Sequence, residues 1–238
     1  MKSRRKVVVV AISILVLLVL VGLLSQPILS SRIKSRIEVA AQKALHVTPA
    51  VRLDGSIAAL ELIDHKISKF TLTTDSYSTK RIAKIGLVAT FTNVSLPHGN
   101  VCAIAGGVSI SASIGVNFVA TQVEQKFKSQ GGLNVAKVTM DQSGINVEAG
   151  PGGVATIVLT PTTKGQELIL KVKTILLFGQ PLSPSKVASL TGNIHPVVPI
   201  NQVPSYLHLI SVSTSASALT LYFQGKDAVL HHGVACLS

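Results

Sequence analysis

The stretch INVEAGPGGVATIVLTPTTKGQELILKVKT, residues 145–174, decides the fold class. Apolar and polar residues alternate in three short runs, and clusters of Gly, Pro or Thr separate them. A period of two is typical of strands, because successive side chains point to opposite faces of a sheet. The stretch therefore predicts three sequential strands with short turns. The strands are Ile145–Glu148, Val154–Thr160 and Glu167–Thr174, and the turn signals are Gly150–Gly153 and Thr162–Gly165.

Before this stretch, the spacing changes to that of a helix. Val119, Val123 and Phe127 lie four residues apart, and polar residues fill the positions between them. This spacing predicts an amphipathic helix over Asn117–Gln130, ended by the glycine pair that follows.

A second amphipathic helix is predicted closer to the N-terminus, over Ser31–His46. Ile37, Ala41 and Leu45 recur on one face, and Pro49 follows the helix. The other predicted elements are strands between Val51 and Leu96, strands Val101–Ile114 and Leu133–Met140, a short helix Ser183–Leu190, a proline-rich connector His195–Pro204, strands Leu207–Ser213 and Ala218–Gln224, and a tail.

The first 30 residues predict a transmembrane helix. Residues 7–24 carry no charge and only one polar side chain, Ser13. In a helix they would span about 27 Å, close to the ~30 Å hydrocarbon core of a bilayer. The basic residues in front favour the cytoplasm, which puts residues 31–238 outside as one extracytoplasmic domain. The alternative is a cleaved signal peptide and a secreted or periplasmic protein, since such peptides have the same basic start.

This order of elements predicts an α+β fold. The N-terminal transmembrane helix is followed by helices packed on one face of a curved antiparallel sheet.

The basic charge is concentrated near the predicted membrane segment. The formal net charge is +12, yet residues 1–36 hold seven basic and no acidic residues, which leaves +5 for the rest. Without basic stripes interleaved with aromatic residues, the chain does not indicate nucleic-acid binding. A mildly cationic domain suits an anionic lipid surface. The residues predicted to face headgroups or the membrane surface are Arg32, Lys34 and Arg36, whose alternative role is membrane topology alone.

The sequence shows no signature of catalysis or metal binding. It contains no G-x-S-x-G, H-E-x-x-H, C-x-x-C or P-loop pattern. Of its seven histidines only His231 and His232 are close in sequence, and they lie in the predicted tail, where we interpret them as solvent-exposed residues. Asp64 and His65 are adjacent, so on a strand they would point to opposite faces. We therefore predict a protein that is not an enzyme and has neither a metal site nor a cofactor.

The two cysteines, Cys102 and Cys236, leave two alternatives open. Outside the cytoplasm they can form one disulfide, worth about 2–4 kcal/mol if it is unstrained. Otherwise they are two buried free thiols.

Apolar residues make up 47% of the chain and charged residues only 13%, so the chain is rich in aliphatic surface. Such side chains can fill an ordinary core or line a groove for acyl chains, where each buried methylene contributes about 0.8 kcal/mol. The helix positions predicted to face the groove or core are Ile37, Ala41, Leu45, Val119, Val123 and Phe127.

The order of segments in the C-terminal third resembles one known family. Gly179-Gln180-Pro181-Leu182 is followed by Val198-Pro199, by Leu207-His208-Leu209 and by Gly225-Lys226-Asp227. Near the front, Leu53-Asp54-Gly55-Ser56-Ile57 precedes an alternating strand. Together these segments resemble the LmeA-like phospholipid-binding family of actinobacteria over roughly residues 31–238.

The resemblance implies a fold similar to tubular lipid-binding proteins. It implies non-enzymatic binding of phospholipids, phosphatidylinositol types included, at the membrane of the cell envelope, in support of lipoglycan assembly. The predicted membrane segment at the front also fits this family, and the apolar run behind a basic start predicts a single-pass plasma membrane protein with an extracytoplasmic domain. Two alternatives remain open: an envelope enzyme or accessory acting on lipid-linked sugars, and a structural interaction module without a ligand.

Overall fold

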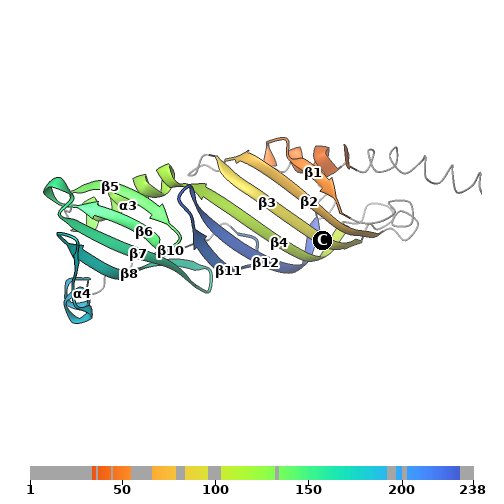
Figure 1. Ribbon diagram of the computed structural model, residues 1–238. Helices are drawn as coiled ribbons and strands as arrows, with labels where there is room; N and C mark the ends of the chain where they lie inside the picture. Colours follow the sequence, from red (N-terminus) through yellow and green to blue (C-terminus); the bar gives the residue numbers. More distant parts are fainter. Residues whose placement is uncertain are drawn as a thin grey trace, which may run out of the picture. The chain divides into compact units, whose positions relative to one another are not determined.

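A computed structural model describes residues 34–35, 37–43, 45–54, 66–78, 84–95, 103–131, 134–191, 197–199 and 203–230. Antiparallel strands dominate these residues and helices are few, so the predicted α+β class is confirmed (Figure 1). The described residues form two six-stranded sheets, whereas the sequence led us to expect one sheet.

The first sheet has the strand order β1-β2-β3-β4-β12-β11. Its first four strands follow the chain, which matches the alternating runs predicted upstream. Its last two strands, β11 and β12, pair antiparallel as a hairpin from the C-terminal part of the chain. The bounds are β1 Ala50–Leu53, β2 Lys66–Tyr77, β3 Ile85–Ser95, β4 Ala103–Gly115, β11 Leu207–Thr214 and β12 Ala218–Leu230.

The second sheet has the order β10-β8-β7-β6-β5, and the short β9 also pairs with β8. The helices α3 and α4 pack against β5 and β8, respectively. The bounds are α3 Val116–Gly131, β5 Val135–Asp141, β6 Gly144–Ala149, the 3-10 turn η1 Pro151–Gly153, β7 Ala155–Lys164, β8 Glu167–Leu177, β9 Gln180–Pro181, α4 Pro184–Thr191 and β10 Val197–Pro199.

The chain divides into two compact units, called unit 1 and unit 2 below. The division falls within β2, β3, β4 and β12, so the second sheet, α3, α4 and β11 all belong to unit 2. Unit 1 comprises Met1–Leu72, Thr90–Gly106 and Val229–Ser238, and unit 2 comprises Thr73–Ala89 and Gly107–Ala228.

The core of unit 2 follows from the period-two alternation of β6 and β7. Ile145, Val147 and Leu159 have exposures of 0%, the lowest of the apolar core. Ile145 pairs with Leu159 and Val147 with Ile157, so the buried residues of both strands lie on the same face. The alternation of apolar and polar residues within 145–174 therefore places the apolar side chains on the buried face, where they form the core of this unit.

The helices appear where apolar residues recur at helical spacing. The helix predicted over Asn117–Gln130 is confirmed as α3, and Ser183–Leu190 as α4. Residues 34, 35, 37–43 and 45 are also helical, which confirms the N-terminal amphipathic helix within the described residues. Lys128 in the last turn of α3 carries the charge that the carbonyl end of a helix favours.

Three predicted boundaries are wrong, and proline explains two of them. β7 runs through Pro161 to Lys164, although Thr162–Gly165 was predicted to be a turn. Val197–Pro199 forms β10 against β8 within the predicted proline-rich connector. Proline hides strands from sequence patterns because it lacks an N–H group, yet it is tolerated where that group needs no partner. The third error is β12, which continues to Leu230 through residues predicted to be a tail.

Among the helices of the described residues, none has both the length and the apolar character needed to cross a membrane. The predicted transmembrane segment, residues 7–24, lies outside the described residues. The predicted domain start at residue 31 lies outside them as well.

A side-chain amide in unit 2 joins the β7–β8 turn to β11. The Gln166 Nε2 group donates to the Leu207 carbonyl oxygen at 2.6 Å, and the Leu209 N–H donates to Gln166 Oε1 at 3.2 Å. β11 also packs against β7 and β6. The amide thus pairs with β11 as a backbone peptide group would, which ties an edge strand of the first sheet to the second sheet.

Gly144→Ala should destabilise the protein. Gly144 has φ +145°, and a Cβ at this position would collide with the Leu159 carbonyl oxygen in the core of unit 2. We expect a loss on the order of 2 kcal/mol, measured by chemical denaturation. Gly115→Ala is the matched control, because a Cβ there meets no atom within 4 Å. Equal stability of the two variants would contradict the predicted collision.

Gln166→Ala should lower the free energy of unfolding by about 1–3 kcal/mol, because two backbone groups of β11 lose their partner. Gln166→Glu should not restore the loss, since a carboxylate cannot donate to the Leu207 carbonyl oxygen. Gln142→Ala, at an exposed turn position, is the control. A wild-type denaturation midpoint for Gln166→Ala would show that the amide contributes nothing.

Candidate functional site

The six apolar positions predicted on the two amphipathic helices lie partly or fully inside the protein. Ala41, Val119 and Val123 are buried. Ile37, Leu45 and Phe127 are half-buried. The first triplet, Ile37, Ala41 and Leu45, belongs to unit 1, and the α3 triplet belongs to unit 2. Their role in contacting lipid stays a prediction.

Lys34 is the one predicted membrane-facing basic residue that the structure describes. It is exposed, and its Nζ lies 3.9 Å from Glu38 Oε1 one helical turn later. Arg32, Arg36, Cys102 and Cys236 lie outside the described residues.

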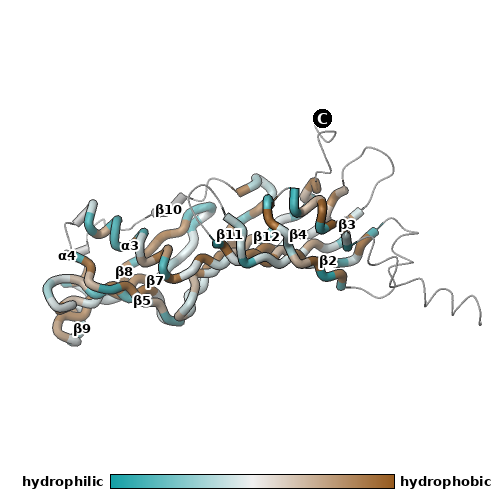
Figure 2. The backbone as a smooth tube through the Cα atoms, turned by 90° about the horizontal axis from the view of Figure 1, so that it is seen from above, coloured by the Kyte–Doolittle hydropathy of each residue, from teal (hydrophilic) through white to brown (hydrophobic). Residues whose placement is uncertain are grey.

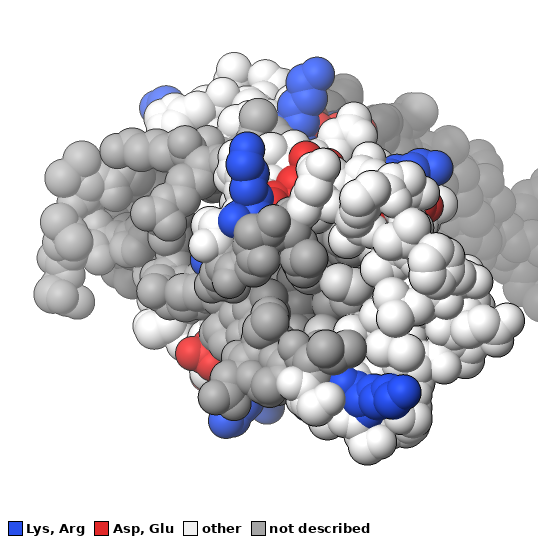
Figure 3. All heavy atoms as spheres, turned by 90° about the vertical axis from the view of Figure 1, so that its left-hand side faces the viewer, with Lys and Arg blue, Asp and Glu red and all other residues white. Residues whose placement is uncertain are grey.

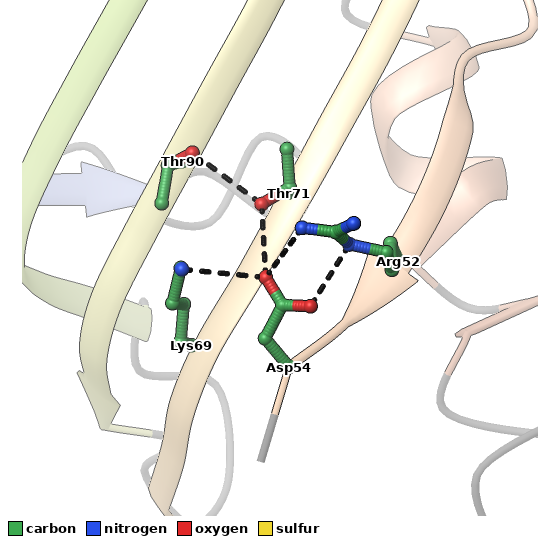
Figure 4. Close-up of polar contacts among 5 residues, drawn as sticks. All are labelled: Arg52, Asp54, Lys69, Thr71 and Thr90. Atoms are coloured by element: carbon green, nitrogen blue, oxygen red, sulfur yellow. Dashed lines mark hydrogen bonds and ion pairs between the residues drawn. The ribbon is translucent and has the colours of Figure 1, made fainter.

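A cluster of polar side chains in unit 1 surrounds Asp54 (Figure 4). Arg52, on β1, holds the carboxylate with two groups: its Nε lies 2.8 Å from Oδ1 and its Nη2 lies 3.2 Å from Oδ2. Lys69, on β2, places its Nζ 3.4 Å from Oδ2. The Asp54 N–H donates to the Lys69 carbonyl oxygen at 3.0 Å. The cluster therefore ties the end of β1 to β2.

Two hydroxyl groups extend the Asp54 cluster to the third strand. The Thr71 hydroxyl donates to Asp54 Oδ2 at 3.4 Å and lies 3.3 Å from the Thr90 hydroxyl, on β3. Thr71 is buried, so these contacts satisfy a polar group that would otherwise be costly to desolvate.

The cluster keeps Asp54 ionised and leaves one unbalanced positive charge. Partial desolvation by itself would raise the pKa of Asp54, but the hydrogen bonds and charges of Arg52 and Lys69 outweigh it and hold the pKa below its ordinary value. A carboxylate with a lowered pKa is a poor proton donor near neutral pH. The two cations therefore stabilise the strands, and their exposed N–H groups remain available to an anion.

The opposite face of the same two strands carries an aromatic pair. Phe70 and Phe91 stack with ring centroids 4.7 Å apart and an angle of 18° between the ring planes. Phe70 precedes Thr71 and Phe91 follows Thr90, so the alternation of a strand turns the rings away from the hydroxyl pair. These rings are not among the candidate site residues predicted from the sequence.

Within the described residues, no cluster of three or more His, Cys, Asp or Glu side chains could hold a metal ion.

Comparison with known proteins identifies the family. The family model for LmeA-like phospholipid-binding proteins matches residues 26–224. Because the match covers most of the chain, the protein belongs to this family, and the resemblance found in the sequence is confirmed. The searches of curated proteins and of solved structures found no match. The family is one of phospholipid-binding proteins, which supports lipid binding in general for this chain.

Asp54→Asn should make the protein less stable at pH 7, because both cations lose their counter-charge. The lowered pKa of Asp54 stabilises the fold above the unfolded-state value of about 3.9, and this contribution disappears as the pH falls through the folded-state pKa. Thermal unfolding midpoints of the wild type and the variant should therefore converge in acid. Asp75→Asn, at an exposed position of β2, is the control. A gap of the same size at pH 7 and at acidic pH would contradict this role.

Proposed function

We propose that this protein binds phospholipids, phosphatidylinositol types among them, in the envelope of an actinobacterial cell. The observation that carries the proposal is the match to the LmeA-like phospholipid-binding family over residues 26–224. The high apolar share of the chain, 47%, supports it, because acyl chains bind through apolar surface and need no catalytic pattern.

The protein acts on the outer side of the plasma membrane, held there by its N-terminal segment. The uncharged residues 7–24 behind a basic start support this location. Its lipid binding supports the assembly of lipoglycans, by analogy with the family to which the sequence is similar. Binding is the whole of its activity, and the reactions of assembly belong to other proteins.

In unit 1, the aromatic face of β2 and β3 supports acyl-chain contact. Phe70 is buried, whereas Phe91 beside it is only half-buried. An aromatic ring presents a large apolar surface with little rotational freedom, and methylene groups pack well against it. We therefore place an acyl chain against Phe91.

Native mass spectrometry of the purified full chain, followed by lipid extraction, tests the proposal. We expect phospholipid to copurify in a near-stoichiometric amount, and the extracted headgroups to include phosphatidylinositol when the host makes it. A chain that copurifies without lipid, and takes up none from vesicles of phosphatidylinositol and phosphatidylcholine, would refute phospholipid binding.

Phe91→Asn should lower lipid occupancy, since a polar amide replaces the accessible part of the ring. Phe91→Leu, which keeps the site apolar, is the matched control and should keep its lipid. Thermal unfolding of both variants separates loss of the ligand from loss of the fold. Unchanged occupancy in a folded Phe91→Asn variant would remove Phe91 from the site while leaving lipid binding intact.

A further inference from the structure

The turn after β8 has a residue that its backbone geometry disfavours. β8 ends at Leu177, which pairs with Gln180 of β9, so Phe178 and Gly179 form a two-residue loop. Their φ angles are +50° and +78°. Positive φ at both central positions defines a type I′ turn, in which Asn, Asp or Gly is preferred first. A bulky side chain at that position is an outlier, so local backbone preference does not explain Phe178.

Burial does not explain Phe178 either. Its exposure is 82%, the greatest of the exposed large apolar residues that the structure describes. Leu177 and Val154 beside it are exposed by 38% and 36%. The Phe178 N–H donates to the Val154 carbonyl oxygen at 2.9 Å, which fixes the turn against the start of β7. Val154, Leu177 and Phe178 are called the apolar tip below, and Figure 2 shows the apolar character of the chain around β9.

From β8 onward, the chain around the apolar tip carries only positive charge, whereas on the β6 side the Glu148 carboxylate lies beside Gly153, which precedes Val154. Between Glu167 and Asp227 the sequence has four lysines and no acidic residue. Lys171 and Lys173 are exposed on β8, and Lys186 is exposed on α4, which packs against β8. Figure 3 looks onto this end of unit 2, where lysine or arginine side chains stand at several places around the edge and acidic ones are fewer.

We propose that the apolar tip inserts into the interfacial region of an anionic phospholipid bilayer, with Phe178 as the inserted side chain. The proposal rests on the proposed phospholipid binding and adds the surface by which the protein contacts the membrane. The exposed ring of Phe178 is held on a fixed turn, so its apolar surface is removed from water only when the acyl-chain region of a bilayer covers it. The anionic surface supplies the charge that Lys171, Lys173 and Lys186 complement.

The spacing along β8 suits this arrangement. Lys173 precedes Leu177 by four residues, about 13 Å along a strand, and is the extra residue of a β-bulge. With the ring at the acyl boundary, the flexible lysine side chains reach toward the headgroup layer. A protein partner with an acidic, apolar surface is the competing occupant, and the experiment below distinguishes it.

The test uses tryptophan as a position-specific reporter, because the chain has none. The full chain with Phe178→Trp is reconstituted in vesicles of phosphatidylcholine with or without phosphatidylglycerol. We expect the indole emission to shift to shorter wavelength with the anionic lipid, and brominated phospholipid to quench it. Ile210→Trp is the matched control, because Ile210 is an exposed apolar residue of β11, 51% accessible, and not part of the tip. Its indole should stay accessible to iodide and unquenched by the lipid.

Failure of the proposal is distinguishable from failure of phospholipid binding. If Phe178→Trp stays open to iodide while native mass spectrometry finds bound lipid, the tip does not insert and the proposed function stands. If the indole is quenched by brominated lipid but no lipid copurifies, the tip inserts and the lipid-carrying function falls. Equal quenching of Phe178→Trp and Ile210→Trp would also overturn the proposal, because contact would then not be specific to the tip.

A second variant makes stability and membrane contact change in opposite directions. Phe178→Asn puts a favoured residue into the type I′ turn, so the unfolding midpoint should rise. In a chain that carries Val154→Trp as reporter, the same change should lower quenching by brominated lipid several-fold. A rise in stability with undiminished quenching would exclude Phe178 as the inserted residue.

The lysines are tested by neutralising charge without touching the tip. Lys171→Gln, Lys173→Gln and Lys186→Gln together should remove the preference of the Phe178→Trp reporter for anionic vesicles. The matched control neutralises Lys126, Lys128 and Lys137, three other lysines of unit 2, and should keep that preference. If the two triple variants lose the preference for anionic vesicles equally, the net charge of the protein directs the contact, and the role proposed for Lys171, Lys173 and Lys186 is wrong.

Discussion

The register of β7 between β6 and β8 is the constraint on which unit 2 depends. It places Ile157 opposite Val147 on one side and Ile175 on the other, so their side chains share the buried face. A slip by one residue would turn every one of these side chains to solvent. The same register ends with Ala155 opposite Leu177, which sets where β8 stops and where the turn at Phe178 begins. The core and the apolar tip are therefore consequences of one hydrogen-bonded ladder.

In unit 1, the two faces of strands β2 and β3 carry different side chains, polar on one face and aromatic on the other. One face holds the Asp54 cluster, in which paired charges and hydroxyl groups fix the strands to one another. The other face holds the stacked rings of Phe70 and Phe91. The alternation of side chains along each strand keeps the paired polar groups and the stacked rings on opposite faces. The proposed acyl-chain contact at Phe91 uses the aromatic side of this division.

Much of the fold could be predicted, because alternation and helical spacing are local properties. The strands from Ile145 to Thr174 and the helix around Val119 and Val123 were found in this way. The family was recognisable from the order of its glycine, proline and aliphatic segments. The strand at Val197–Pro199 was missed, because its pairing with β8 depends on a partner about 30 residues away and its proline hides the pattern. The division into two sheets was missed for the same reason, since sheet membership depends on long-range pairing.

The sequence by itself determined most of the secondary structure, the excess of aliphatic residues and the family, because each depends on residue types and short spacings. Only the tertiary structure decided which side chains meet. Nothing in the spacing of Arg52, Asp54, Lys69 and Thr90 indicates one cluster, since β1, β2 and β3 bring them together by pairing. Likewise, Phe178 stands directly before the family segment Gly179-Gln180-Pro181-Leu182 and carries no signal of its own in the sequence. Its exposed ring and its positive φ become visible only after β8 and β9 close the turn, because backbone conformation and solvent exposure are properties of the folded chain.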